Sequence, residues 1–350
     1  MRLGARRRER SGKKRLLHGR GYISIGALAG GGHCEVRFRM MAKKCNALTA
    51  LGRVLRSEKY RFAAVTPATH RRVLHHLQGP TTLQSVFGWN RPFERKAVAA
   101  HILDLLTEAE ALDETSGLYR SKVRYATLGD LLFVHSGFPT TEKDAVFFGP
   151  DTYRFARLLR SSLAEMSVNR PLRLIDVCSG SGAGGIYAAR LLGSPMELVL
   201  SDINHKALAF SAVNAALNDL PCTETAFSDI LDGIEGETDL IIGNPPYLVD
   251  EERRLYRHGG GELGIELALR IVEQSLARLR PGGRLILYAG TPIIGGVDPF
   301  FESLRPLVQL HGLQFVYEEI DPDVFGEELE RQAYAQADRI AVVGFTVIKG

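Results

Sequence analysis

The sequence has few cysteines and no long apolar run. Its four cysteines, Cys34, Cys45, Cys178 and Cys222, form no Cys-x-x-Cys pair and lack metal-ligand spacing, so neither a disulfide scaffold nor a metal site is expected. No stretch of 18 apolar residues occurs, which argues against a transmembrane helix. We therefore expect a cytoplasmic protein with no metal and no membrane partner.

Acidic residues are scarce at the start of the chain. Residues 1–44 hold 13 Lys and Arg but two acids, a net charge of +11, which leaves 31 basic and 38 acidic residues and −7 for the rest. This composition predicts a basic, disordered arm over residues 1–45, which either binds nucleic acid or is merely solvated. Arginine-rich, acid-poor segments also occur in presequences, and Met40 and Met41 offer alternative translation starts.

Residues 46–144 are predicted to form a smaller, mainly helical domain that ends in a β-hairpin. Helices are expected at residues 46–57, 67–76, 81–89 and 93–110 from apolar spacing and capping residues. Residues 118–125 alternate in polarity and, with residues 130–135, indicate the hairpin. Such a domain is either a winged-helix module that binds nucleic acid or a cap over a substrate pocket.

Residues 145–350 alternate between apolar strand patterns and amphipathic helices. After a turn with Asp151 or Thr152 as N-cap of a helix, strands are expected at residues 172–177, 197–201, 225–227, 239–242, 284–289, 313–320 and 340–348, and helices at residues 184–192, 205–217, 262–279 and 299–310. Pro281-Gly-Gly is expected to end the third of these helices. The alternation predicts an α/β fold with a doubly wound parallel sheet.

A glycine-rich turn joins the first strand of this region to a helix. It reads Asp176-Val-Cys-Ser-Gly180-Ser-Gly182-Ala-Gly-Gly185, and glycines allow a tight turn that a ligand can approach closely. The spacing Gly-x-Gly-x-x-Gly, with Asp202 further on, matches the dinucleotide fingerprint. A nicotinamide-dependent dehydrogenase is therefore one alternative.

Acids at three successive strand ends favour a different ligand. Asp176 precedes the turn, where a carboxylate suits a positively charged amino group and repels pyrophosphate. Asp202, followed by Ile203, is placed to accept hydrogen bonds from both hydroxyls of a ribose. Asp229 suits the exocyclic amine of adenine, with Ile230 against the ring. Amine, ribose and adenine describe S-adenosylmethionine, although each acid alone also fits a helix cap.

A stiff loop follows the strand at residues 239–242. It consists of Asn244, Pro245, Pro246 and Tyr247. Proline fixes φ, has no N–H and makes the preceding residue extended, so the asparagine amide and nearby carbonyls point in fixed directions. They suit the hydrogens of a planar –NH2 group, on which the tyrosine ring can stack. The alternative is an ordinary Pro-Pro turn.

On these motifs, residues 145–350 resemble the class I S-adenosylmethionine-dependent methyltransferases whose fourth strand ends in Asn-Pro-Pro-Tyr. This group includes N6-adenine and N2-guanine methyltransferases of nucleic acids and release-factor glutamine methyltransferases. The resemblance implies a Rossmann-like sheet of seven strands in the order 3-2-1-4-5-7-6, with strand 7 antiparallel. The candidate cofactor residues are Asp176, Cys178, Gly180, Gly182, Asp202, Ile203, Asp229 and Ile230, with Phe148 and Thr152 over the methionine end; the catalytic candidates are Asn244, Pro245, Pro246 and Tyr247.

The sequence departs from the family in two places. Cys178 stands where a glycine is usual, and a small residue should still fit the turn. Residues 257–264, Arg-His-Gly-Gly-Gly-Glu-Leu-Gly, replace the Phe-Glu-Pro stretch of glutamine methyltransferases and also suit a hinge for a substrate lid.

We therefore expect a methyltransferase acting on a planar nitrogen of a macromolecule, either a nucleic-acid base amine or a glutamine amide. The alternatives are a nucleic-acid-binding protein that retains the fold and, less favoured, the dehydrogenase.

Overall fold

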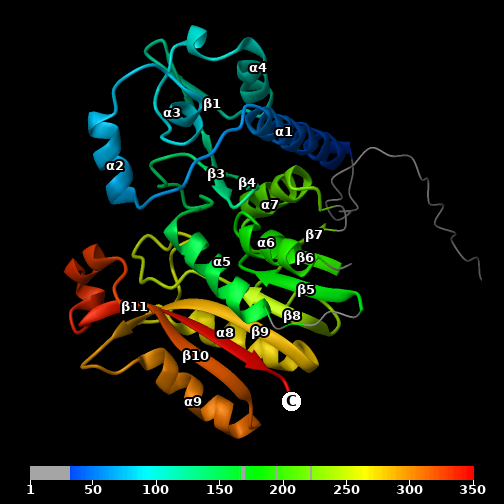
Figure 1. Ribbon diagram of the computed structural model, residues 1–350, viewed down its shortest axis with the longest axis vertical. Helices are drawn as coiled ribbons and strands as arrows, with labels where there is room; N and C mark the ends of the chain where they lie inside the picture. Colours follow the sequence, from blue (N-terminus) through cyan, green and yellow to red (C-terminus); the bar gives the residue numbers. More distant parts are fainter. Residues whose placement is uncertain (1–31, 165, 167–169, 194–195, 221–222) are drawn as a thin grey trace, which may run out of the picture.

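The computed structural model describes residues 32–350 except 165, 167–169, 194–195 and 221–222. Its largest element is a seven-stranded sheet in the order β10-β11-β9-β8-β5-β6-β7 (Figure 1). The strands are β5 (Leu172–Val177), β6 (Met196–Asp202), β7 (Thr223–Phe227), β8 (Thr238–Gly243), β9 (Leu279–Ile293), β10 (Gln314–Asp321) and β11 (Arg339–Ile348). Strands β5 to β9 pair in parallel, whereas β11 is antiparallel to both β9 and β10. The predicted fold class and the order 3-2-1-4-5-7-6 are confirmed.

Helices cover both faces of this sheet. Helices α5 (Pro150–Leu163), α6 (Ala183–Leu192) and α7 (His205–Leu217) lie on one face, and α8 (Glu266–Arg278) and α9 (Pro299–His311) on the other. Leu174 and Ile175 are consecutive on β5, yet they belong to opposite hydrophobic clusters. Side chains of a strand point alternately to the two faces of the sheet, so a strand covered on both faces reads as a continuous apolar run.

Two expected boundaries in this region are wrong. Pro281-Gly-Gly does not stand between helix and strand but lies inside β9, which begins at Leu279. The end of the chain holds it there, because Gly282 N donates to Lys349 O at 2.7 Å and Lys349 N donates to Gly283 O at 2.9 Å. Neither Asp151 nor Thr152 is the N-cap of α5. That residue is Gly149, whose N–H donates to the Thr152 hydroxyl at 3.3 Å.

The N-terminal part contains four α-helices and two hairpins among the described residues. They are α1 (Gly32–Ser57), α2 (Pro67–His76), α3 (Leu83–Phe87), α4 (Ala100–Glu108), β1 (Leu112–Thr115), β2 (Leu118–Ser121), β3 (Val123–Leu128) and β4 (Leu131–Ser136). Helix α1 begins inside the expected arm, since Met, Ala and Lys at residues 40–44 are good helix formers. Expectations for residues 1–31 lie outside the described residues. The helix expected at residues 93–110 is a short 3-10 turn (Arg95–Ala97) followed by α4.

The single hairpin expected at residues 118–135 is wrong. Residues 118–125 divide at Lys122 into β2, which pairs with β1, and β3, which pairs with β4. The buried Ser121 hydroxyl donates to Val123 O at 2.7 Å, which turns the chain at that point. An alternating pattern gives no sign of such a break.

The N-terminal part shares a core with α7. Phe210 of α7 belongs to the same buried cluster as residues of α1, α3, α4 and β4. Asn214 accepts from Val134 N at 2.7 Å and donates to Val134 O at 3.0 Å, and Asn218 makes the same pair of bonds to Leu132. Both side-chain amides are buried, and all their N–H groups and oxygens have hydrogen-bond partners. They pair the outer backbone edge of β4 with a helix, so the two parts of the molecule are packed as one body.

Candidate active site

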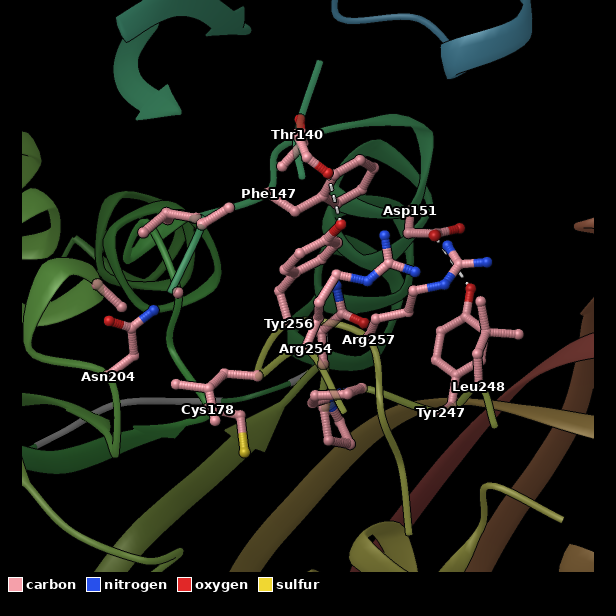
Figure 2. A pocket seen from close by; sticks show the side chains of 18 of the residues that line it. Thr140, Phe147, Asp151, Cys178, Asn204, Tyr247, Leu248, Arg254, Tyr256 and Arg257 are labelled. Atoms are coloured by element: carbon pink, nitrogen blue, oxygen red, sulfur yellow. Dashed lines mark hydrogen bonds between the residues drawn. The ribbon is translucent and has the colours of Figure 1, made fainter. Parts of the chain in front are cut away.

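A cavity of about 680 Å³ opens at the carboxyl ends of β5, β6 and β8, between the sheet and the N-terminal part (Figure 2). Ligand sites of open α/β sheets lie at this edge, beside the point where the strand order reverses. On the cofactor side the wall is formed by Asp176, Cys178, Ser179, Gly180, Asp202, Ile203, Asp229 and Ile230; on the acceptor side by residues 138–141, 244–248, 254–257 and 325, together with Arg71, Phe147 and Thr152. The cavity therefore brings together nearly all the predicted site residues.

The glycine-rich turn is held by the carboxylates around it. Asp176 accepts a hydrogen bond from Gly185 N at 2.7 Å, and Asp202 accepts from Gly180 N at 2.9 Å. Gly182, with φ of +74°, is the N-cap of α6. Cys178 has φ of +53°, a left-handed conformation that costs a non-glycine residue about 1 kcal/mol. Cysteine thus fits where the family usually has glycine, at the cost of some backbone strain.

The three predicted cofactor acids differ in their surroundings. Burial raises the pKa of Asp176 to about 7, although the Gly185 N–H opposes the shift. Burial also raises the pKa of Asp202. Asp229 is half exposed and bound to Arg270 on α8 at 2.9 Å. A buried and a half-buried carboxylate, both with raised pKa values, favour a cationic or hydroxyl-bearing ligand, which would stabilise their ionised forms.

The Ser179 hydroxyl is one observation on whether S-adenosylmethionine fits this cavity. It is buried in the cavity wall and has no hydrogen-bond partner among the described residues. Buried hydroxyls are normally satisfied, so an unpaired one beside a cavity indicates a polar ligand. With acids suited to an amino group and a ribose on the same wall, the residues fit this cofactor. A pyrophosphate would meet the same acids with its own negative charge, which disfavours the dinucleotide alternative.

Tyr247 is fixed more tightly than its motif suggests. Its hydroxyl donates to Asp151 Oδ2 at 3.0 Å, and Tyr288 donates to Asp151 Oδ1 at 2.9 Å. Burial raises the pKa of Asp151, and the two tyrosine hydrogen bonds oppose that rise. The Tyr247 ring is 7% exposed and packs on Gly290, where an added Cβ would lie 2.0 Å from the ring. The hydroxyl and the ring together hold the Asn-Pro-Pro-Tyr loop in place, while Asn244 lines the cavity.

The glycine run after this loop packs against it. Gly259 N donates to Leu248 O at 2.9 Å, and Leu248 N donates to Arg257 O at 3.0 Å. A Cβ on Gly259 would lie 2.0 Å from Gly264 O and 2.6 Å from Tyr247 Cα. Glycine is needed there for close backbone approach, a role different from the lid hinge considered above.

Two predicted cofactor residues, Gly182 and Phe148, do not line the cavity. Phe148 is 1% exposed and packs in the core, with ring centroids 5.6 Å from Phe133 and 5.7 Å from Tyr153. Its neighbour Phe147 faces the cavity instead, and Thr152 lines it as expected. The segment passes between core and cavity, so its two neighbouring rings cannot both face the ligand.

Sequence reasoning missed most of the acceptor wall. Tyr256 donates its hydroxyl to Thr140 O at 2.8 Å, which ties the segment after the Asn-Pro-Pro-Tyr loop to the N-terminal part (Figure 2). Arg257 pairs with Asp250 at 3.3 Å and also with Glu328. The contacts of Tyr256 with Thr140 and of Arg257 with Glu328 join residues far apart in the chain, and no local pattern signals them.

Three features together define a class I methyltransferase domain. They are the sheet order, the acids at the ends of the first three strands, and the Asn-Pro-Pro-Tyr loop after the fourth strand. Residues 145–293 match the family model described as methyltransferase small domain. The predicted resemblance is confirmed for this part of the chain, and with it the class of S-adenosylmethionine-dependent methyltransferase domain.

Curated relatives share this region. A release factor glutamine methyltransferase of Borreliella burgdorferi is 30% identical over 141 residues, which cover 37% of this chain and 49% of that protein. A ribosomal RNA small subunit methyltransferase C of Shewanella loihica is 34% identical over 136 residues, covering 38% and 36%. The chain thus spans about half or less of the length of these two relatives.

Solved structures with a similar fold include a ribosomal protein L11 methylase from Lactobacillus delbrueckii subsp. bulgaricus. It is 18% identical, with a TM-score of 0.39, and the match covers 57% of this chain and 80% of that one. TrmN from Thermus thermophilus is 19% identical, with a TM-score of 0.38, and the match covers 82% and 81%.

Proposed function

We propose that this protein transfers a methyl group from S-adenosylmethionine to a planar nitrogen of a macromolecule, either a nucleic-acid base amine or a glutamine side-chain amide. The observation that carries the proposal is that three strand-end carboxylates and the Asn-Pro-Pro-Tyr loop line one cavity. A charged cofactor and a planar acceptor can therefore meet inside it. Of the two curated relatives described above, one is named for a glutamine acceptor and the other for ribosomal RNA.

The cofactor side holds the ligand through its acids. Bound S-adenosylmethionine supplies an electrophilic methyl group on a positively charged sulfur. Asp176 accepts a hydrogen bond from the amino group of the cofactor. Asp202 accepts hydrogen bonds from the ribose hydroxyls, and Asp229 accepts one from the adenine amine. Ile203 and Ile230 flank the ring. Because Arg270 already binds Asp229, the adenine amine shares that carboxylate with a guanidinium.

The acceptor side activates the nitrogen without a strong base. The lone pair of an amide or aryl amine is delocalised, so the nitrogen is a poor nucleophile. Asn244 Oδ1 and the Pro245 carbonyl accept hydrogen bonds from its N–H groups, which raises electron density and favours the tetrahedral transition state. The methyl group leaves the sulfur as S-adenosylhomocysteine forms, and the methylated nitrogen is acidic and loses its proton to water afterwards. Tyr247 and Asp151 serve this step by fixing the loop.

Transfer of a labelled methyl group tests the proposal. The protein is incubated with methyl-labelled S-adenosylmethionine and a cell extract, which is then divided and digested with nuclease or protease. The proposal is supported if a macromolecular fraction takes up label and if this labelling is lost when Asn244 is replaced. Tight binding of nucleic acid with no transfer would favour the non-catalytic alternative, and tighter binding of NADH than of S-adenosylhomocysteine would favour the dehydrogenase. The cytoplasmic location and the absence of a metal requirement stay predictions.

A further inference from the structure

We propose that Phe147 and Tyr256 form an aromatic wall against which an unpaired nucleobase stacks while its exocyclic amine reaches Asn244. This inference rests on the proposed function and chooses the base amine over the glutamine amide as acceptor. Tyr247 takes no part in stacking.

The two rings form a prepared surface. Their planes differ by 14° and their centroids lie 6.1 Å apart, and both side chains are half buried in the wall of the cavity that contains Asn244. The Tyr256 hydroxyl is anchored on Thr140 O. The tip of the Phe147 ring packs on Gly149, where an added Cβ would lie 2.4 Å from Phe147 Cζ. Figure 2 shows the Phe147 ring above the Tyr256 ring, with Thr140 above both.

Tyr247 offers little surface to an acceptor. Its ring is 7% exposed and is enclosed by Gly290, Tyr288 and Phe325, with centroids 6.4 Å from Tyr288 and 6.0 Å from Phe325. Its hydroxyl is occupied by Asp151. A planar acceptor that reaches Asn244 therefore meets the half-exposed pair first.

The surroundings of this pair favour nucleic acid over a peptide. Arg71 of α2 lies at the cavity, is exposed and has no carboxylate partner within salt-bridge distance among the described side chains. Arg72, His75 and His76 on the same helix are also exposed. Residues 59–99 contain seven Lys and Arg but a single acid, Glu94.

Aromatic rings beside a basic surface bind the bases and phosphates of single strands. A glutamine amide presents a smaller flat face to an aromatic ring than a base does, and it gives α2 no negative charge to bind. The cavity volume lies in the range that encloses one small ligand with few further groups, so a base must enter unpaired, as bases do in other base-modifying enzymes.

The test begins with the substrate fraction. Full-length protein and methyl-labelled S-adenosylmethionine are incubated separately with deproteinised RNA, deproteinised DNA and nucleic-acid-free protein from the same cells. We expect nuclease-sensitive label, and more of it after heat denaturation of the nucleic acid than before. Label confined to a glutamine of the protein fraction would overturn the inference and leave the proposed function intact. No label in any fraction, with S-adenosylhomocysteine bound, would overturn both.

Variants then test the wall itself. Tyr256→Leu and Phe147→Leu keep apolar bulk but remove a ring face, and each should lower kcat/KM on the labelled nucleic acid by about tenfold to hundredfold, which is ~1.4 to ~2.8 kcal/mol. The loss should appear mainly in KM, with unchanged affinity for S-adenosylhomocysteine.

Tyr256→Phe keeps the ring and should retain most activity. Phe315→Leu, on the outer strand β10, is the matched control for loss of an exposed ring. Equal losses in Tyr256→Phe and Tyr256→Leu would assign Tyr256 a role through its hydroxyl and would overturn the stacking role. Unchanged kcat/KM in both leucine variants would do the same.

Discussion

The cofactor side and the acceptor side of the cavity are built from contacts of different range. On the cofactor side, Asp176 binds Gly185 nine residues away, and Asp202 binds Gly180 22 residues away. On the acceptor side, Tyr247 binds Asp151 across 96 residues. The first side is one strand-turn-helix unit and its neighbour, whereas the second forms only when distant parts of the chain meet.

This difference implies that the two sides can be damaged separately. A change at the acceptor loop should leave cofactor affinity intact, and a change at a strand-end acid should leave the acceptor loop in place. The predictions below test that separation, from the largest expected effect to the smallest.

Asn244→Ala should lower turnover by about 10²–10³, by analogy with loss of one group that stabilises charge in a transition state. Affinity for S-adenosylhomocysteine should stay within twofold, because Asn244 contacts only the acceptor. Single-turnover methyl transfer and calorimetric titration measure the two effects. A variant that methylates at the parent rate would remove the role of Asn244, and a parallel fall in affinity would break the separation of the two sides.

Asp202→Ala should weaken cofactor binding by about 1.5–3 kcal/mol, because hydrogen bonds to a charged acceptor are lost. The carboxylate also holds Gly180 N and Asn204 N, so part of the loss comes from a looser turn. Asp202→Asn keeps the shape and one acceptor oxygen and should be milder. Titration with S-adenosylhomocysteine checks both variants, and unchanged affinity in Asp202→Ala would reject the ribose role.

Tyr247→Phe should lower the free energy of unfolding by about 1–3 kcal/mol, since it leaves buried Asp151 with one donor fewer. From the motif alone this change looks mild, because the ring is kept. Tyr256→Phe is the control, as its hydroxyl is only partly buried and binds a neutral carbonyl. Chemical denaturation compares the two. Equal stability would show that the Asp151 hydrogen bond contributes nothing.

Affinity for S-adenosylhomocysteine should rise about threefold to tenfold between pH 6 and pH 8. Burial raises the pKa of Asp176 to about 7, so below that pH the carboxyl is largely neutral and cannot pair with the ligand's ammonium group. Binding favours the ionised form and releases a proton, hence affinity increases with pH through the pKa. In Asp176→Asn the affinity should be low and nearly independent of pH, and an unaltered pH profile would reject the pairing.

Local signals explain what the sequence predicted. Helix α2 has the ends that the sequence predicts, and in the structure Thr66 caps it and Pro67 is its first residue. The strand-end acids were found because each follows its own apolar run. The role of Phe147 in place of Phe148, the break at Lys122 and the partner of Tyr247 depend on packing between distant segments. No pattern within a short window contains that information.

The two asparagines of α7 have a consequence for how the chain is made. During synthesis, β4 leaves the ribosome well before Asn214 and Asn218, which later pair its outer backbone edge. Until then that edge is unpaired, and unpaired edges invite association with other chains. Phe210 and its neighbours on α7 are likewise exposed if the N-terminal part is cut away. A fragment from either half should therefore aggregate unless the other half is supplied, and the two fragments expressed together should recover a soluble pair.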